Sequence, residues 1–548
     1  MRIILIQSAV LRLLLTLLSL ALAAPVLAVG ASWLGFDAAG WAVLRHLAQT
    51  VLADYATQSA VLAVGVALGV AVLGVGSAVA VALFRFPGRG FFEWALLLPM
   101  AMPAYVLAYA ATDALQFSGA LQTGLRSAFG WRGALWPDVR SLGGAVILFV
   151  LCLYPYVYLL TRVALGERAV QLMEAARLLG ASPRRRVLAV ALPLARPAVV
   201  AGVALALMET LADYGVGAYF GLSTFTTGIY RAWLSMNDPI AAAQLASLLL
   251  LLVAALLVME RRAQARLRFA ASRAPAGASE GQPLQLSGAR AALAWAICAL
   301  PVGAGFVAPV AWLAAMWWRE AAAGEGAAPW DRFAGWAASS FWLAGAAALA
   351  ATALALALGF ARRRQGSAVS PMDRAVALGA RALSLGYAVP GAVLAIGILV
   401  PLGWAQQRWP DAGLAALFTG SALGLMVAYL ARFSAVAMQS VDAGYARVSP
   451  SVDETARMLG AGPARVFTRL HLPLLRRPAL GAALLVFVDA MKELPATLVL
   501  RPFGMDTLAV TAYQLARDER LAEAALPSLA IVAVGLLPVL LLSRAMRH

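Results

Sequence analysis

The stretch EAARLLGASPRRRVLAVALPL, residues Glu174–Leu194, is a polar segment between two apolar runs that are each long enough to cross a bilayer. It carries one carboxylate, four arginines and two prolines. Gly180 suits the left-handed position that ends a helix, and Ser182 and Pro183 suit the N-cap and first turn of a second helix. The segment therefore predicts a compact helical hairpin outside the membrane.

Apolar runs recur along the whole chain of 548 residues. Hydrophobic residues make up 62% of the sequence and charged residues 13%, whereas an ordinary soluble domain is about 45–50% apolar. A helix needs about 20 apolar residues to cross a bilayer. We therefore expect an all-α integral membrane protein with about twelve membrane-spanning helices. They lie near residues 11–33, 57–84, 91–115, 142–163, 198–218, 239–259, 291–318, 339–361, 378–403, 412–433, 479–500 and 524–543.

The polar segment has a second copy, ETARMLGAGPARVFTRLHLPL, residues Glu454–Leu474. An offset of 280 residues aligns the two copies without a gap. Because the copies are separated by an even number of predicted spans, they face the same side and the repeat is parallel. The sequence thus predicts two tandem repeats of about six spans, joined by a cytoplasmic linker that is rich in Ala, Gly, Ser, Pro and Arg. The repeats cover residues 1–262 and 291–548, and the linker covers 263–290.

Arginines gather in alternate loops of this predicted topology. By the positive-inside rule, these loops and both chain termini are expected on the cytoplasmic side of the bacterial inner membrane. The net charge of +17 then reflects membrane orientation and not nucleic-acid binding. The first apolar run could also be a cleaved signal peptide, but the many spans that follow favour an uncleaved helix.

The two polar segments are longer than a connection between spans requires. A connector needs a few residues, whereas each of these loops uses about thirty, at 167–196 and 447–478. In the simpler interpretation the hairpins only join spans, and Glu174 and Glu454 only cap helices. Their length and their repetition favour docking surfaces instead.

The pattern E-A-A, three residues, Gly, about nine residues and an apolar-x-L-P ending resembles the EAA loop of membrane permease subunits in ABC importers. The second copy departs slightly, with Thr455 where the first has Ala175. The resemblance implies a type I ABC importer permease fold, in which each loop seats in a groove of a separate ATPase, expected as a homodimer. By this resemblance the coupling contacts are Glu174, Ala175, Ala176, Gly180, Glu454, Ala456 and Gly460.

The chain itself cannot contain a P-loop for ATP. That motif requires a lysine in G-x-x-x-x-G-K-[ST], and the single lysine of the chain, Lys492, lies in AMKEL. We also find no clustered His or Cys ligands and no paired catalytic acid and base on a loop. The sequence therefore predicts no catalytic residue, cofactor or metal site, and a partner has to bind the ATP.

An acidic pair follows each polar segment. Glu209 with Asp213, and Asp489 with Glu493, are four residues apart, so that each pair lies on one helical face. Burial of both members in lipid would cost about 5–7 kcal/mol per helix, so they must face protein or water. They could line a path that admits cations, or pair with Lys492 or with arginines to hold helices together, and the sequence leaves both interpretations open.

The stretches METLADYGVGAYFG, TFTTGIYRAW and AMKELPATLVLRPFG resemble the ferric-iron importer permeases. Those are fused two-half proteins that work with a periplasmic iron-binding protein and a cytoplasmic ATPase. Related permeases carry thiamine, polyamines, sulfate or molybdate, and these cargoes stay open as alternatives. An ion-coupled secondary transporter would also show repeats and buried carboxylates, but it would not need two docking hairpins.

Overall fold

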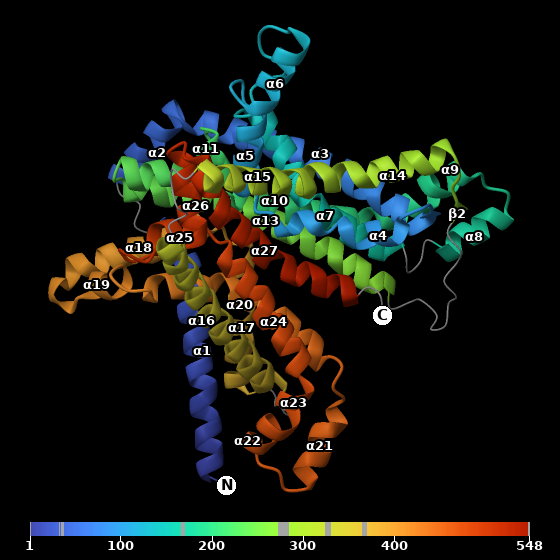
Figure 1. Ribbon diagram of the computed structural model, residues 1–548. Helices are drawn as coiled ribbons and strands as arrows, with labels where there is room; N and C mark the ends of the chain where they lie inside the picture. Colours follow the sequence, from blue (N-terminus) through green and yellow to red (C-terminus); the bar gives the residue numbers. More distant parts are fainter. Residues whose placement is uncertain are drawn as a thin grey trace. The chain divides into compact units, whose positions relative to one another are not determined.

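The computed structural model describes residues 2–31, 33, 38–165, 170–271, 284–323, 330–363 and 370–545 (Figure 1). Apart from a two-residue parallel pairing of β1 (Phe84–Arg85) with β2 (Leu284–Gln285), the regular structure in these ranges is helical. Nine helices there are long and apolar enough to cross a membrane, and one pair with a bend of 91° would make a tenth. The prediction of an all-α membrane protein is confirmed.

Five of the twelve predicted spans are broken helices. Pro103 and Pro390 stand at two of the breaks, and the residues before them, Met102 and Val389, have extended backbones. A proline disfavours the helical conformation in the residue before it, and at these two positions that residue is extended, so the helix is interrupted. The parts of the five broken spans are α4 (Arg89–Ala95) and α5 (Ala104–Leu115), α10 (Leu192–Ala212) and α11 (Gly215–Tyr219), α17 (Pro371–Leu383) and α18 (Gly391–Arg408), α19 (Leu414–Phe418) and α20 (Leu423–Tyr445), and α24 (Arg476–Met491) and α25 (Pro495–Leu500).

The helices form two compact units that do not coincide with the two sequence halves. Each unit combines the middle helices of one half with terminal helices of the other half. The boundaries of the repeats, 1–262 and 291–548, stay a prediction. The first unit consists of Met1–Leu44, Ala232–Ser247 and Asp331–Val510, and the second of Arg45–Arg231, Leu248–Trp330 and Thr511–His548.

In the first unit, the N-terminal helix α1 (Arg2–Ala31) packs against helices from the second half of the chain. It contacts α17, α18 and α20 (Leu423–Tyr445), and α20 packs on α24. Arg12 in α1 forms an ion pair of 2.8 Å with Asp373 in α17. The other helices wholly within this unit's segments are α19 (Leu414–Phe418), α21 (Pro450–Met458), α22 (Pro463–Val466), α23 (Leu472–Leu474) and α25, and α16 (Trp330–Arg363) begins one residue before the segment Asp331–Val510.

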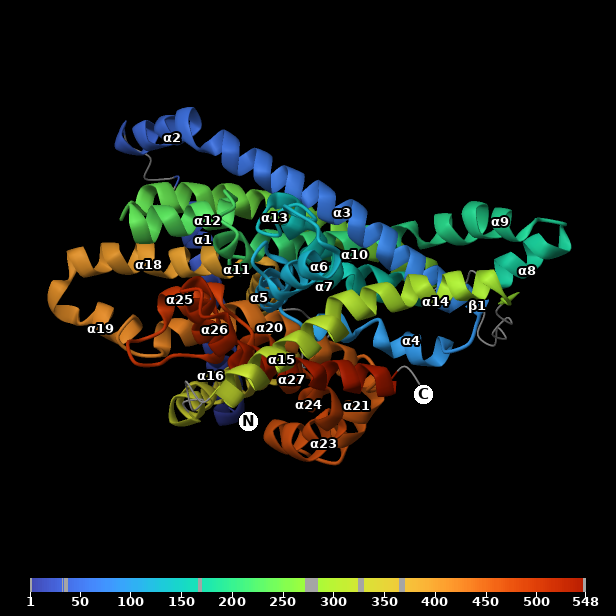
Figure 2. The ribbon, with the colours of Figure 1, turned by 45° about the horizontal axis from the view of Figure 1, so that its top comes forward.

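The second unit is built around α3 (Leu52–Leu83), α7 (Leu142–Ala164) and α10 (Leu192–Ala212), which pack against one another (Figure 2). From the second half of the chain, α14 (Ala289–Val302) packs on α3, and α15 (Ala308–Ala323) packs on α5 and α27 (Leu521–Ala545). Also in this unit are α6 (Ala120–Phe129), α8 (Val170–Leu178), α9 (Pro183–Arg186), α11 (Gly215–Tyr219) and α12 (Phe225–Tyr230). Among the described helices, three cross from one unit to the other by more than one residue: α2 (Ala38–Thr50), α13 (Pro239–Ala271) and α26 (Leu508–Arg517).

Replacing Gly397 by valine should loosen α1 from α18. Gly397 lies in α18, and a Cβ atom placed on it overlaps the carbonyl group of Pro25 in α1. We expect a loss of stability of about 1–3 kcal/mol, measured as a lower melting temperature of the detergent-solubilised protein. Gly403 in the same helix has no atom within 4 Å of such a Cβ, so Gly403→Val is the matched control. Equal melting temperatures for the two variants would contradict the prediction.

Candidate functional site

The two polar segments fold into matching helical hairpins. The first hairpin, residues 170–191, contains α8 and α9, and the second hairpin, residues 450–471, contains α21 and α22 (Figures 1 and 2). Each ends in a five-residue π-helical turn, Val187–Ala191 in the first and Phe467–His471 in the second. These turns are also related by the offset of 280 residues, so the two copies share a backbone irregularity as well as a sequence pattern.

A glycine in the left-handed conformation makes the turn in both hairpins. Gly180 has φ +81° and Gly460 has φ +75°. In the first hairpin the N–H of Ala181 donates to the carbonyl of Ala176 at 2.9 Å, and the equivalent bond in the second hairpin measures 3.0 Å. These bonds satisfy carbonyl groups at the end of the first helix. Residues other than glycine and asparagine are strained in this conformation, which accounts for the glycine in both copies.

Two apolar side chains are exposed at the tip of each hairpin. Leu178 and Leu179 are 89% and 87% exposed, and Met458 and Leu459 are 89% and 82% exposed. Exposed apolar groups at matching places are typical of a protein interface. The sequence prediction of coupling residues did not include these side chains, although the apolar pair precedes the glycine in both copies.

The predicted coupling residues lie on the same helices and turns as these tips. In the first hairpin Ala175 and Gly180 are exposed and Ala176 is half-buried, while the side chain of Glu174 lies outside the described residues. In the second hairpin Glu454 and Gly460 are exposed and Ala456 is half-buried. Their part in coupling stays a prediction.

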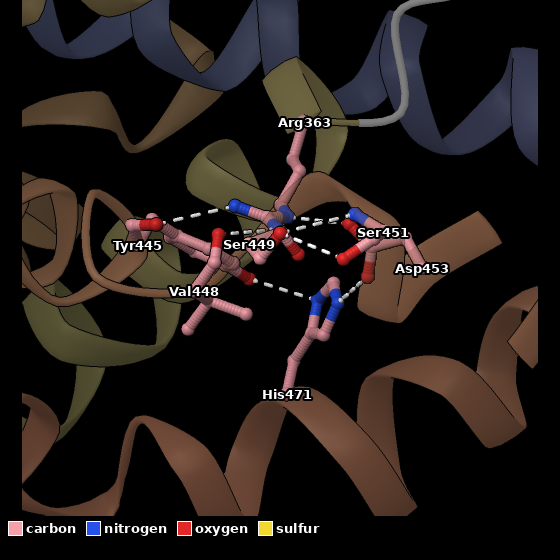
Figure 3. Close-up of polar contacts among 7 residues, drawn as sticks. All are labelled: Arg363, Tyr445, Val448, Ser449, Ser451, Asp453 and His471. Carbon is pink, nitrogen blue, oxygen red and sulfur yellow. Dashed lines mark hydrogen bonds and ion pairs between the residues drawn. The ribbon is translucent and has the colours of Figure 1, made fainter. Parts of the chain in front are cut away.

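A buried polar cluster holds the second hairpin to the end of α16 (Figure 3). Arg363 donates through Nε to Asp453 Oδ2 at 2.5 Å, and through Nη2 to the carbonyls of Val448 and Ser449 at 2.8 and 2.9 Å. The other carboxylate oxygen of Asp453 lies 2.5 Å from Nε2 of His471, which is 1% exposed. The cluster ties the start of α21 both to α16 and to the π-helical turn.

The first hairpin has no equivalent of the Asp453–His471 contact. The offset of 280 places Met173 opposite Asp453 and Ala191 opposite His471, and both Met173 and Ala191 are buried. These two positions are therefore apolar in the first hairpin and polar in the second. The sequence prediction missed the polar contact because the three histidines are far apart along the chain.

The structure places two of the predicted acidic residues at the start of short helices. Asp213 ends α10 and accepts a hydrogen bond of 2.8 Å from the N–H of Val216 in α11. Glu493 accepts bonds of 2.9 and 3.0 Å from the N–H groups of Ala496 and Thr497 in α25. Both carboxylates thus satisfy amide groups that a continuous helix would have bonded internally.

The two acidic pairs, Glu209 with Asp213 and Asp489 with Glu493, differ in the charged residues near them. Glu493 also forms an ion pair of 3.2 Å with Arg432, and Asp489 forms one of 3.1 Å with Lys492. Glu209 is half-buried and acts electrostatically on Asp213. Glu493 therefore links the break before α25 to α20 through Arg432, whereas Asp489 and Lys492 lie three residues apart at the end of α24. A role of the acidic residues in the translocation path stays a prediction. Within the described ranges, no group of three or more His, Cys, Asp or Glu residues could hold a metal ion.

Lowering the pH should weaken the polar cluster of the second hairpin. Burial alone would raise the pKa of Asp453, but the hydrogen bonds from His471 and Arg363 outweigh burial and hold this pKa below its usual value. A lowered carboxyl pKa stabilises the fold above the unfolded value of about 3.9, and this contribution is lost as the pH falls through the folded pKa. Asp453→Asn should therefore cost about 1–3 kcal/mol near neutral pH, and its difference from wild type should shrink below about pH 4.

Melting temperatures of the wild-type protein and of Asp453→Asn across this pH range test the prediction. Glu454→Gln is the matched control, because it removes an exposed carboxylate from the same helix. A gap between wild type and Asp453→Asn that stays constant with pH would show that the carboxylate charge does not stabilise the cluster.

The model of a family described as "Binding-protein-dependent transport system inner membrane component" matches residues 71–268 and 366–548. The chain is 25% identical to the Fe(3+)-transport system permease protein FbpB 2 of Haemophilus influenzae over 503 residues, which is 90% of each chain. It is 29% identical to the putative 2-aminoethylphosphonate transport system permease protein PhnV of Salmonella typhimurium over 157 residues, 29% of this chain and 56% of that relative. It is 31% identical to the molybdenum transport system permease protein ModB of Escherichia coli over 141 residues, 25% of this chain and 57% of that relative.

The family model covers more than half of the chain, and one of its two matched segments falls on each predicted repeat. The prediction of an importer permease made of two fused halves is therefore confirmed, as is its place as a multi-pass protein of the inner membrane. Members of this family work with a separate ATPase and a substrate-binding protein. The chain belongs to the family of binding-protein-dependent transport system inner membrane components, and it is the permease component of an ABC importer.

Proposed function

We propose that the chain forms the translocation path for ferric iron, Fe³⁺, delivered by a periplasmic binding protein. The observation that carries this proposal is the extent of the match to the ferric-iron permease, which includes both halves and 90% of each chain. The molybdenum and 2-aminoethylphosphonate permeases match 25% and 29% of this chain. Thiamine, polyamines, sulfate and molybdate are the alternative cargoes.

The acidic pairs support a cation as cargo. Glu209, Asp213, Asp489 and Glu493 place carboxylates on helices that follow the two hairpins, and carboxylates inside a membrane protein commonly mark an ion pathway. They would repel sulfate or molybdate. We assign these four residues to the translocation path, with Glu493 also bracing helices through Arg432.

The two hairpins are the proposed docking sites for the ATPase. Each presents a left-handed glycine and an exposed apolar pair, and an apolar pocket on the partner would remove those side chains from water. Because the two hairpins share this geometry, two identical ATPase subunits could each accept one, which favours a homodimer. The proposed coupling residues are Glu174, Ala175, Ala176 and Gly180 in the first hairpin, and Glu454, Ala456 and Gly460 in the second.

This function sets the orientation of the chain. The ATPase is cytoplasmic, so the hairpins and the arginine-rich loops on their side must be cytoplasmic as well. The positive-inside rule supports the same orientation, and it places both termini in the cytoplasm. The partner ATPase hydrolyses the ATP, because this sequence has no lysine in a P-loop motif.

Iron transport is tested with the purified chain in proteoliposomes that contain the cognate ATPase, with the binding protein outside. We expect accumulation of ⁵⁵Fe from the iron-loaded binding protein, and this accumulation should depend on ATP. The ligand of the binding protein is identified separately by elemental analysis and mass spectrometry. Uptake by this chain alone under an ion gradient would overturn the importer mechanism, and a bound oxyanion, polyamine or thiamine would overturn the choice of iron.

Charged substitutions at the two hairpin glycines should separate the permease from its ATPase. Gly180→Glu and Gly460→Glu force a strained side chain into the left-handed turn at about 1–2 kcal/mol each, and 1.4 kcal/mol is about tenfold in a docking equilibrium. We expect loss of uptake and reduced ATPase co-purification. Gly462→Glu is the matched control, because Gly462 has φ −70° and no atom within 4 Å of a Cβ placed on it.

Asparagine provides a second comparison at the same positions. It tolerates the left-handed conformation, so Gly180→Asn and Gly460→Asn should retain more ATPase than the glutamate variants. Unchanged uptake in the double glutamate variant would refute the coupling role of these turns.

A further inference from the structure

The long helix α16 is held by polar contacts toward both of its ends. Toward its start, Oγ of Ser340 accepts a hydrogen bond of 2.8 Å from the N–H of Leu508. At its end, Arg363 donates to Asp453 and to two carbonyls just before α21 (Figure 3). The helix is continuous between these contacts, and its 34 residues extend over about 50 Å. One helix therefore links the second hairpin to a distant part of the same compact unit.

The polar cluster at the end of α16 is closed to water and fixed in several directions. Asp453 and His471 are 5% and 1% exposed. Nδ1 of His471 lies 3.4 Å from the hydroxyl of Tyr445, at the end of α20. The ring of Phe360 in α16 packs edge to face on His471, with 5.3 Å between the ring centroids. Because hydrogen bonds weaken steeply away from their preferred angles, the hairpin cannot turn relative to α16 without losing several of these contacts.

The first half keeps the contact far from the hairpin and lacks the one at the hairpin. The counterpart of α16 is α3, and there Oγ of Ser59 accepts a bond of 3.2 Å from the N–H of Phe225. At the other end of α3, the offset of 280 places Leu83 opposite Arg363, and Leu83 is buried. The three positions of the cluster are therefore all apolar in the first half. Apolar contacts are not directional, so they fix an orientation less strictly.

An adjacent arginine at the end of α16 has a different partner. Arg362 forms an ion pair with Asp442 in α20, where the two side chains are 30% and 44% exposed. Ion pairs with this exposure contribute little to stability. Neither residue lies in the second hairpin, whereas Arg363 contacts the start of α21. The two arginines therefore separate the attachment of α16 to the hairpin from its attachment to α20.

We propose that Arg363 is a positioning residue for transport, which joins the second hairpin to α16 through Asp453 and His471. When the ATPase moves this hairpin, α16 moves with it. The first hairpin lacks this connection, so the two hairpins contribute unequally to transport. This inference rests on the proposed docking of the ATPase to the hairpins. A buried polar network whose members are all satisfied is rigid, and coupling between two sites is carried by such networks and by rigid helices.

The test gives the second half the residues of the first half. The first-half variant combines Arg363→Leu, Asp453→Met and His471→Ala, so no buried charge is left without a partner. Replacing a whole buried ion pair by apolar residues is often tolerated. Iron uptake and ATP hydrolysis are measured in the same proteoliposomes, with the cognate ATPase and ⁵⁵Fe-loaded binding protein. We expect unchanged ATPase co-purification, and iron taken up per ATP should fall at least about fivefold, the lower end of usual coupling effects.

Two further variants separate coupling from stability. Asp442→Asn is the matched control, because it removes the neighbouring ion pair and leaves the hairpin contacts in place. It should keep the wild-type ratio of iron to ATP. Arg363→Lys keeps the charge but loses the guanidinium fork, and its ratio should lie between those of wild type and the first-half variant. A role in stability alone would lower uptake and hydrolysis together and leave their ratio unchanged.

All variants are first checked for monodisperse elution and for ATPase co-purification. If the first-half variant does not fold, Arg363→Lys decides, and a wild-type ratio of iron to ATP in that variant overturns the proposal. A second measurement does not depend on the cargo. Binding protein as purified, added outside, should raise ATP hydrolysis by wild type and by Asp442→Asn, and this stimulation should be lost in the first-half variant.

The outcomes distinguish this connection from the proposed function. If the first-half variant retains the ATPase and matches wild type in iron per ATP and in stimulation, the connection is wrong and docking of the ATPase stands. If the double variant of Gly180→Glu and Gly460→Glu keeps its ATPase and its uptake, the docking sites are wrong, and the inference built on them falls as well. If wild type accumulates no iron, the cargo is wrong, and the stimulation of ATP hydrolysis decides on the connection.

Discussion

Inside a bilayer there is no water to bond a free backbone N–H or C=O group, so each of these groups needs a partner within the protein. This requirement makes the chain helical wherever it crosses the membrane. A break in a helix costs free energy unless a side chain forms hydrogen bonds with the backbone groups that the break leaves free. The carboxylates of Asp213 and Glu493 intervene in this way, by accepting hydrogen bonds from the first amides of α11 and α25. Acidic side chains and broken helices are thus two parts of one arrangement.

Patterns within the sequence were enough to predict the spans, the parallel repeat and the two hairpins. Hydrophobic runs and arginine clusters are local signals, and the matched glycines identify the turns because only a few residues accept a positive φ. The breaks near Pro103 and Pro390 were harder to predict. A proline inside a long apolar run can kink a helix or end it, and the choice depends on neighbouring helices that supply the missing contacts.

Contacts between distant parts of the chain could not be predicted. The exchange of terminal helices between the two units has no local signal, because α1 is equally apolar whichever helices it packs against. The cluster of Arg363, Asp453 and His471 brings together residues from three elements.

The π-helical turns at Val187–Ala191 and Phe467–His471 set the rotational phase between each hairpin and the helix that follows it. One residue of an α-helix corresponds to a rotation of about 100°, and a π-helical turn accommodates about one residue more than an α-helical turn does. The hairpin helix and the span that follows it therefore differ in rotation about the helix axis, although the backbone between them is continuous. The direction in which each hairpin points is thereby encoded in the number of residues in this turn, as well as in their chemistry.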